Sequence, residues 1–248
     1  MADWNPWHGC EKYSAGCLNC YVYRRDAKYE LDASAVRKNA AFDLPVRKRR
    51  DGSYQLKGPD DVFCCFTSDF FLDKADEWRG DAWRMMRERG DLKFFMITKR
   101  ILRFHEQLPA DWGDGYENVS IGVTCENQAM ADVRLPYFLT LPVRHRLIIC
   151  EPMLESIDLR PYLRGGVEQV VAGGESGDSA RLMRYDWALG LRKQCEEANV
   201  PFWFKQTGAR FEKDGKIYRI LRKDQFSQAR KSGLSFGARR IETANPEG

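Results

Sequence analysis

The sequence predicts an α/β fold, a partial (β/α) barrel of the TIM type with mostly parallel strands. Short continuous apolar runs alternate with helical stretches at least six times along the middle and C-terminal parts of the chain. Such runs are typical of parallel strands that are buried on both faces. The chain also has no Gly-x-Gly-x-x-Gly fingerprint of a dinucleotide-binding sheet, although a doubly wound open sheet remains the alternative.

The apolar runs give the expected strands, and each is followed by a polar or glycine-bearing turn. The expected strands are residues 62–66, 93–97, 118–123, 146–150, 167–172 and 201–204. Helical patterns cover about 74–89, 126–138 and 186–198, with a short helix ending near Leu108. Because the carboxyl ends of parallel strands share one edge, the polar residues that follow them should line one cavity.

Two segments stand outside this alternation. Residues 1–208 form the expected barrel, interrupted at about 33–59 by a basic, glycine-containing insertion that we expect to be a lid. Residues 209–248 form an expected C-terminal extension packed on the barrel. The extension contains a candidate hairpin, with Asp214-Gly215 as its turn.

Composition points to a globular protein of a reducing compartment. The 248 residues are 43% apolar and 31% charged, and no apolar stretch approaches the roughly 20 residues that span a bilayer. The N-terminus lacks the pattern of a signal peptide, so we expect a cytoplasmic protein with no membrane partner. The net charge is only +4, and the basic clusters at 47–50 and between Arg219 and Arg240 fit a phosphate-binding or a solvated surface equally well.

Three of the eight cysteines cluster near the N-terminus: Cys10, Cys17 and Cys20, in the spacing C-x6-C-x2-C. In a reducing compartment, clustered cysteines favour a metal over disulfides. Three thiolates can hold a [4Fe–4S] cluster and leave one iron open to another ligand. With His8 as a fourth ligand they would instead form a structural zinc site. The spacing alone leaves both interpretations open.

Several motifs resemble a phage-associated three-cysteine family, the bacteriophage gene-product 37/68-like proteins. They are Asn5-Pro6-Trp7-His8-Gly9-Cys10, Gly16-Cys17-Leu18-Asn19-Cys20-Tyr21, Gly122-Val123-Thr124-Cys125-Glu126-Asn127, Glu151-Pro152-Met153, Ala172-Gly173-Gly174-Glu175-Ser176-Gly177 and Phe202-Trp203-Phe204-Lys205-Gln206-Thr207-Gly208. That family is similar to radical S-adenosylmethionine (SAM) enzymes, whose usual cysteine spacing is C-x3-C-x2-C. The resemblance implies a [4Fe–4S] cluster on Cys10, Cys17 and Cys20, bound SAM, and a cluster loop after a very short first strand.

Candidate site residues follow from the strand ends and the resemblance together. We expect catalytic roles for Lys99, Glu151, Lys205 and Gln206. We expect cofactor binding by Tyr21, Ser68, Glu126, Asn127, Gly173, Gly174, Glu175 and Ser176. For Glu126 a charge that complements the helix N-terminus is an equal alternative, and for 173–177 a plain glycine turn is the simpler one.

The leading hypothesis is a radical SAM enzyme whose 5′-deoxyadenosyl radical abstracts hydrogen from a substrate. Isomerisation or rearrangement of a modified base, in DNA or a nucleotide, fits phage DNA hypermodification, with flavodoxin or ferredoxin as electron donor in the host cytoplasm. The alternative is a zinc-stapled nucleic-acid-binding protein without redox catalysis. A metal-free hydrolase is disfavoured, because none of the three histidines lies in a nucleophile–base pattern.

Overall fold

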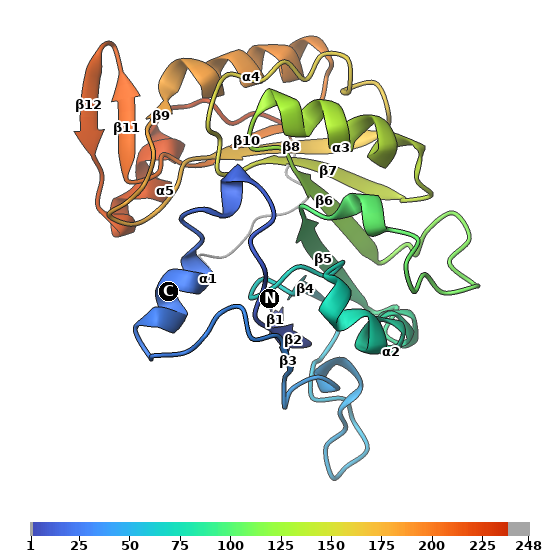
Figure 1. Ribbon diagram of the computed structural model, residues 1–248. Helices are drawn as coiled ribbons and strands as arrows, with labels where there is room; N and C mark the ends of the chain where they lie inside the picture. The colour runs from blue at the N-terminus through green and yellow to red at the C-terminus, as the bar shows by residue number, and fades with distance from the viewer. Residues whose placement is uncertain (1, 238–248) are drawn as a thin grey trace.

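The protein, described here by a computed structural model over residues 2–237, contains a curled sheet of seven parallel strands (Figure 1). Neighbouring strands follow the order β1-β4-β5-β6-β7-β8-β10. Their bounds are Ala2–Trp4 (β1), Asp60–Cys64 (β4), Leu92–Thr98 (β5), Val119–Thr124 (β6), His145–Cys150 (β7), Val167–Gly173 (β8) and Phe202–Gln206 (β10). The sheet forms half of a barrel, which confirms the predicted partial (β/α) barrel.

The strand order explains why the sheet curls into a half-barrel. It never reverses along the chain, so right-handed crossovers place their helices on the same face. Figure 1 shows this outer layer of helices, α2 (Asp76–Glu88), α3 (Gln128–Thr140) and α4 (Tyr185–Glu197). A doubly wound sheet would need a reversal and helices on both faces, so that alternative does not apply.

The two faces of the sheet are filled by two apolar clusters. The larger cluster lies between the strands and the helices and reaches from Trp4 to Leu234. The smaller one fills the concave face and consists of Phe63, Phe95, Leu147, Ile149, Val171 and Trp203. Residues of one strand alternate between the faces, so burial of both accounts for the continuous apolar runs seen in the sequence.

The structure differs from the expected elements in several places, including the segment after β5 and the segment after Cys20. The short helix expected to end near Leu108 is a single turn of 3₁₀ helix, Ile101–Arg103, and ends earlier than expected. The N–H groups of Lys99 and Arg100 donate to the side chains of Asp69 and Thr98, and Gln107 adopts a φ of 58°, which no helix continues. An additional helix, α1 (Tyr21–Ala27), follows Cys20.

The insertion at 33–59 packs on the edge of the barrel. Its strand β3 (Arg37–Lys38) pairs antiparallel with β2 (Trp7–His8). The buried Arg89 guanidinium, at the end of α2, donates to the carbonyls of Pro45 and Leu56. These contacts fix the insertion beside β2 and α2.

The described part of the extension confirms the expected hairpin. Strands β11 (Arg210–Lys213) and β12 (Lys216–Arg219) pair antiparallel, and β11 also pairs with β9 (Met183–Arg184). Asp214 and Gly215 have φ values of 53° and 74°, as a two-residue turn of type I′ requires. Helix α5 (Arg222–Lys231) then packs along β10. The end of the extension, 238–248, including the predicted basic Arg239 and Arg240, lies outside the described residues.

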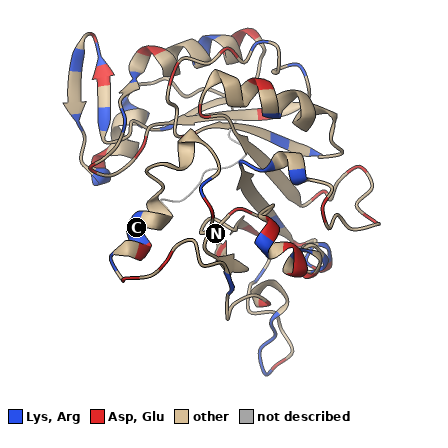
Figure 2. Cartoon of the chain, viewed as in Figure 1, with Lys and Arg blue, Asp and Glu red and all other residues tan. Residues whose placement is uncertain are grey.

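The charged residues are distributed over several elements. Figure 2 shows basic and acidic segments side by side on the outer helices, the insertion and the β11–β12 hairpin. The insertion and the hairpin lie on different sides of the half-barrel in this view. None of the described helices is long and apolar enough to cross a membrane.

Candidate functional site

A cavity of about 200 Å³ opens at the carboxyl edge of the half-barrel. One wall is the segment 10–20, called here the cysteine loop, which contributes Cys10, Cys17 and Cys20. The other walls are residues at the ends of β4, β5, β6, β7, β8 and β10: Cys65, Phe66, Ser68, Asp69, Ile97, Thr98, Lys99, Arg100, Thr124, Ile149, Glu151, Pro152, Gly174, Glu175, Ser176, Lys205 and Gln206. The structure thus brings the predicted strand-end residues together, while the insertion contributes none of the lining residues and does not cover this cavity as a lid.

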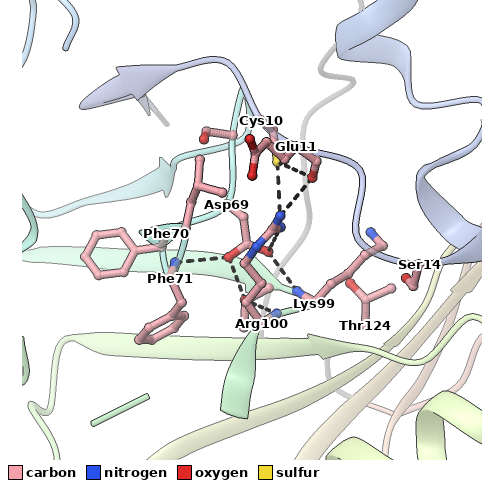
Figure 3. A network of polar contacts seen from close by, with 12 residues as sticks. Cys10, Glu11, Ser14, Asp69, Phe70, Phe71, Lys99, Arg100 and Thr124 are labelled. Carbon is pink, nitrogen blue, oxygen red and sulfur yellow. Dashed lines mark hydrogen bonds and ion pairs between the residues drawn. The ribbon is translucent and has the colours of Figure 1, made fainter. Parts of the chain in front are cut away.

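Cys10 is held by the end of β5. Arg100 donates to the carbonyl of Glu11 at 2.8 Å, and its Nη1 lies 3.8 Å from Cys10 Sγ (Figure 3). The same guanidinium lies 3.8 Å from the carboxylate of Asp69. The Tyr23 hydroxyl donates to the carbonyl of Cys10. The Arg100 cation beside the sulfur favours its thiolate, but burial and the nearby Asp69 carboxylate outweigh it and raise the pKa of the Cys10 thiol to about 12.

Glu126, just beyond Cys125 at the end of β6, holds the middle of the cysteine loop. Its Oε1 accepts the Ser14 hydroxyl and the Gly16 N–H, the latter at 3.1 Å. Its Oε2 lies 2.8 Å from Nη1 of Arg134 on α3. Burial raises the pKa of the Glu126 carboxyl, but the Ser14 hydrogen bond and the Arg134 charge outweigh burial and hold it below its ordinary value.

Glu175, just beyond Gly174 at the end of β8, holds the other side of the loop. It accepts from the Asn19 amide at 3.0 Å and from the backbone and guanidinium of Arg181. Arg181 in turn donates to the carbonyl of Ala15 at 2.9 Å. Burial raises the pKa of Glu175, and the Arg181 and Asn19 hydrogen bonds reverse that effect, so the net shift is downward.

A third polar network lies between the ends of β7 and β10. Lys205 Nζ is 2.9 Å from Glu151 Oε2, and the Gln206 amide donates to Glu151 Oε1. Arg222 of α5 donates to Gln206 Oε1 at 2.7 Å. The amide orientation of Gln206 is therefore fixed by a donor on one side and an acceptor on the other.

Lys99 differs from the other cations of the cavity. Its backbone N–H donates to Asp69, and its side chain extends toward Ser14 and Thr124 (Figure 3). Within residues 2–237 its ammonium has no hydrogen-bond or ion-pair partner. The buried hydroxyl of Thr124, which also lines the cavity, likewise has no partner in that part of the chain. Both groups are available to an added ligand.

The predicted residues divide into those that line the cavity and those beside it. Tyr21, Ser68, Gly174, Glu175 and Ser176 line it, together with all four residues expected to be catalytic. Glu126, Asn127 and Gly173 are not among the lining residues. Asn127 instead caps α3 by accepting the Met130 N–H at 2.9 Å.

Several site residues were missed by sequence reasoning. Asn19, Arg181 and Arg222 lie outside the strand ends from which the candidates were chosen. Arg222 belongs to the extension, and Asn19 is 156 residues from the carboxylate that it binds. No local pattern marks such pairs.

The three cysteines fit a [4Fe–4S] cluster by their placement. Cys10, Cys17 and Cys20 are half-buried and face one cavity, whereas the other five cysteines are buried. Residues 2–237 contain no set of three or more His, Cys, Asp or Glu side chains arranged around a single metal ion. In a cluster each thiolate binds a different iron, so the sulfurs need not converge on one point. His8, the fourth ligand in the alternative zinc interpretation, has its Nε2 2.6 Å from the carboxylate of the buried Asp26.

Comparison with known proteins gives one match. A family model described as "Protein of unknown function (DUF5131)" matches residues 1–239. No curated protein and no solved structure matches the chain.

Proposed function

The chain belongs to the DUF5131 family, proteins of unknown function, and we propose that it is a radical SAM enzyme. Cys10, Cys17 and Cys20 would hold a [4Fe–4S] cluster with one iron open for SAM. The observation that carries the proposal is the placement of the three half-buried thiols on one wall of a single cavity. That cavity lies at the carboxyl edge of a parallel half-barrel, where ligands of such folds bind.

When bound and reduced, the cluster would supply the electron that cleaves SAM to a 5′-deoxyadenosyl radical. The protein's own groups position the ligands and exclude water. Phe66, Ile97 and Ile149 give the cavity apolar walls, which shield a radical from solvent. Lys99 is suited to an anionic group of a ligand, because its ammonium lacks a partner within residues 2–237.

The proposed reaction is hydrogen abstraction that leads to isomerisation or rearrangement of a modified base, in DNA or a nucleotide. Glu151, Lys205 and Gln206 would contact the substrate as one hydrogen-bonded unit. The proposal includes the reducing cytoplasm as the location and an electron donor such as flavodoxin or ferredoxin.

The test is formation of 5′-deoxyadenosine from SAM. The protein is purified without oxygen, reconstituted with iron and sulfide, and reduced with dithionite. We expect 5′-deoxyadenosine from the wild-type protein and none from Cys17→Ala. Cys195→Ala is the matched control, because Cys195 is buried on α4 away from the cavity lining, and it should keep its iron and its product.

Two results would contradict the proposal. One is a colourless protein that holds one zinc ion and leaves SAM intact, as expected for the nucleic-acid-binding alternative. The other is product formation that persists in Cys17→Ala at the wild-type rate.

A further inference from the structure

The cysteine loop is held from two strand ends by buried carboxylates, and these contacts suggest a role other than ligand binding. We propose that Glu126 and the Glu175–Arg181 pair are positioning residues, which fix Cys17 and Cys20 in their ligating arrangement before any metal binds. This inference deepens the proposed function and rests on it for the identity of the metal group.

The hydrogen-bonding capacity of Glu126 is directed at the protein itself. The residue is 0% exposed, and Ser14 and Gly16 donate to one of its oxygens. Its other oxygen pairs with Arg134, which also donates to the carbonyl of Thr124 at 2.7 Å. The carboxylate thereby ties the loop to β6 and α3 and is not among the groups that line the cavity.

Glu175 lines the cavity, but both its oxygens also contact the loop or its support. Arg181 binds it through the backbone N–H, Nε and Nη2, a two-pronged pair with fixed geometry. Asn19 donates one bond to Glu175 and another to the carbonyl of Ser179 at 2.8 Å. Arg181 reaches the carbonyl of Ala15. The segment that carries Cys17 is therefore bound at Ala15 and again at Asn19.

Cys10 depends on different residues. Its neighbourhood is fixed by Arg100, by the Tyr23 hydroxyl and by Ser68, which donates to the carbonyl of Gly9. Loss of the Glu175–Arg181 pair should thus release Cys17 and Cys20 while leaving Cys10 in place. A general destabilisation of the fold would instead expose all three thiols alike.

The first test uses the metal-free protein, so it does not depend on cluster chemistry. The variant is Glu175→Gln with Arg181→Met, which removes both charges and leaves neither buried without its partner. We expect iodoacetamide to alkylate Cys17 and Cys20 roughly tenfold faster than in wild type, with Cys10 unchanged, as the loss of a few hydrogen bonds predicts. The matched control is Asp158→Asn with Arg160→Met, an exposed pair with the same chemistry away from the loop.

The second test separates positioning from direct SAM binding. After reconstitution, the double variant should retain less iron and show an altered electron paramagnetic resonance spectrum. Those molecules of the double variant that do hold a cluster should bind SAM with the wild-type dissociation constant. Full iron content, an unchanged spectrum and unchanged alkylation, together with weaker SAM binding, would make Glu175 a SAM ligand and overturn the inference. The inference would also be overturned if Cys17 of the folded wild-type protein were alkylated as fast as Cys17 of the protein unfolded in urea. Absence of 5′-deoxyadenosine would contradict the proposed function and leave the alkylation test intact.

Discussion

Arg134 and Glu126 form the most deeply buried ion pair of the cysteine-loop region. Their side chains are 1% and 0% exposed, and their charged atoms lie 2.8 Å apart. A buried pair is expensive to break, because removing one charge leaves the other without water or a partner. The cysteine loop is attached to this pair, because Ser14 and Gly16 donate hydrogen bonds to Glu126.

Substitution of Glu126 therefore tests how much this single carboxylate contributes to the stability of the fold. The partners of Glu126 hold its pKa below the ordinary 4.5 in the folded protein. A carboxyl with a depressed folded pKa stabilises fully above its unfolded pKa and loses this stabilisation as pH falls through the folded value. Glu126→Gln should lower the free energy of unfolding by about 3 kcal/mol at neutral pH. Below about pH 5 the stability of the variant should fall less steeply with pH than that of the wild type.

The measurement is the melting temperature of both proteins from pH 7 downward. Glu175 has a lowered pKa too and remains in the variant, so the slope should decrease without vanishing. Parallel curves for the two proteins would show that Glu126 contributes no pH-dependent stability.

At the scale of elements, Gly122 lets β6 fit the crowded concave face. A Cβ at this position would lie 2.8 Å from Ile149 Cγ1 and 3.3 Å from Phe95 Cε2. Added volume in a packed core costs typically 1–3 kcal/mol. We expect Gly122→Ala to destabilise the protein by about 2 kcal/mol in urea unfolding.

Gly190 on α4 is the matched control for the same chemical change. No heavy atom lies within 4 Å of a Cβ built there, and alanine favours a helix over glycine by about 1 kcal/mol. Gly190→Ala should therefore stabilise the protein. Equal effects of the two substitutions would mean that the concave face yields to extra volume.

The strands, turns and helices differ in how well the sequence could predict them. The parallel strands were found because burial on both faces leaves continuous apolar runs, and Asp214-Gly215 was found because its turn requires positive φ. Strand β1 has only three residues, too few to show a pattern, and α1 could not be anticipated from the cysteine spacing. The topology of a parallel sheet predicted that the strand ends meet at one cavity. It could not predict the long-range hydrogen bonds Asn19–Glu175 and Arg222–Gln206.

At the scale of the whole molecule, two segments that lie far apart in the sequence meet at the cavity. The cysteine loop follows β1 at one edge of the sheet, and Arg222 enters from α5 beside β10 at the other. The extension is also tied to the barrel by the pairing of Phe202 with Phe236 and by the Thr207 N–H, which donates to the carbonyl of Gln225. Both ends share one apolar cluster.

This shared core predicts that the barrel and the described extension unfold together. Domains with a common core unfold cooperatively, whereas an independently folded appendage gives its own transition. Hydrogen exchange in increasing urea should show amides of α5 opening at the same midpoint as those of β10, and tryptophan fluorescence should follow the same curve. All seven tryptophans precede the extension, so fluorescence reports on the barrel and α5 exchange reports on the extension. An α5 transition at clearly lower urea would show that the extension is a separate unit and that Arg222 reaches the cavity only while that unit is docked.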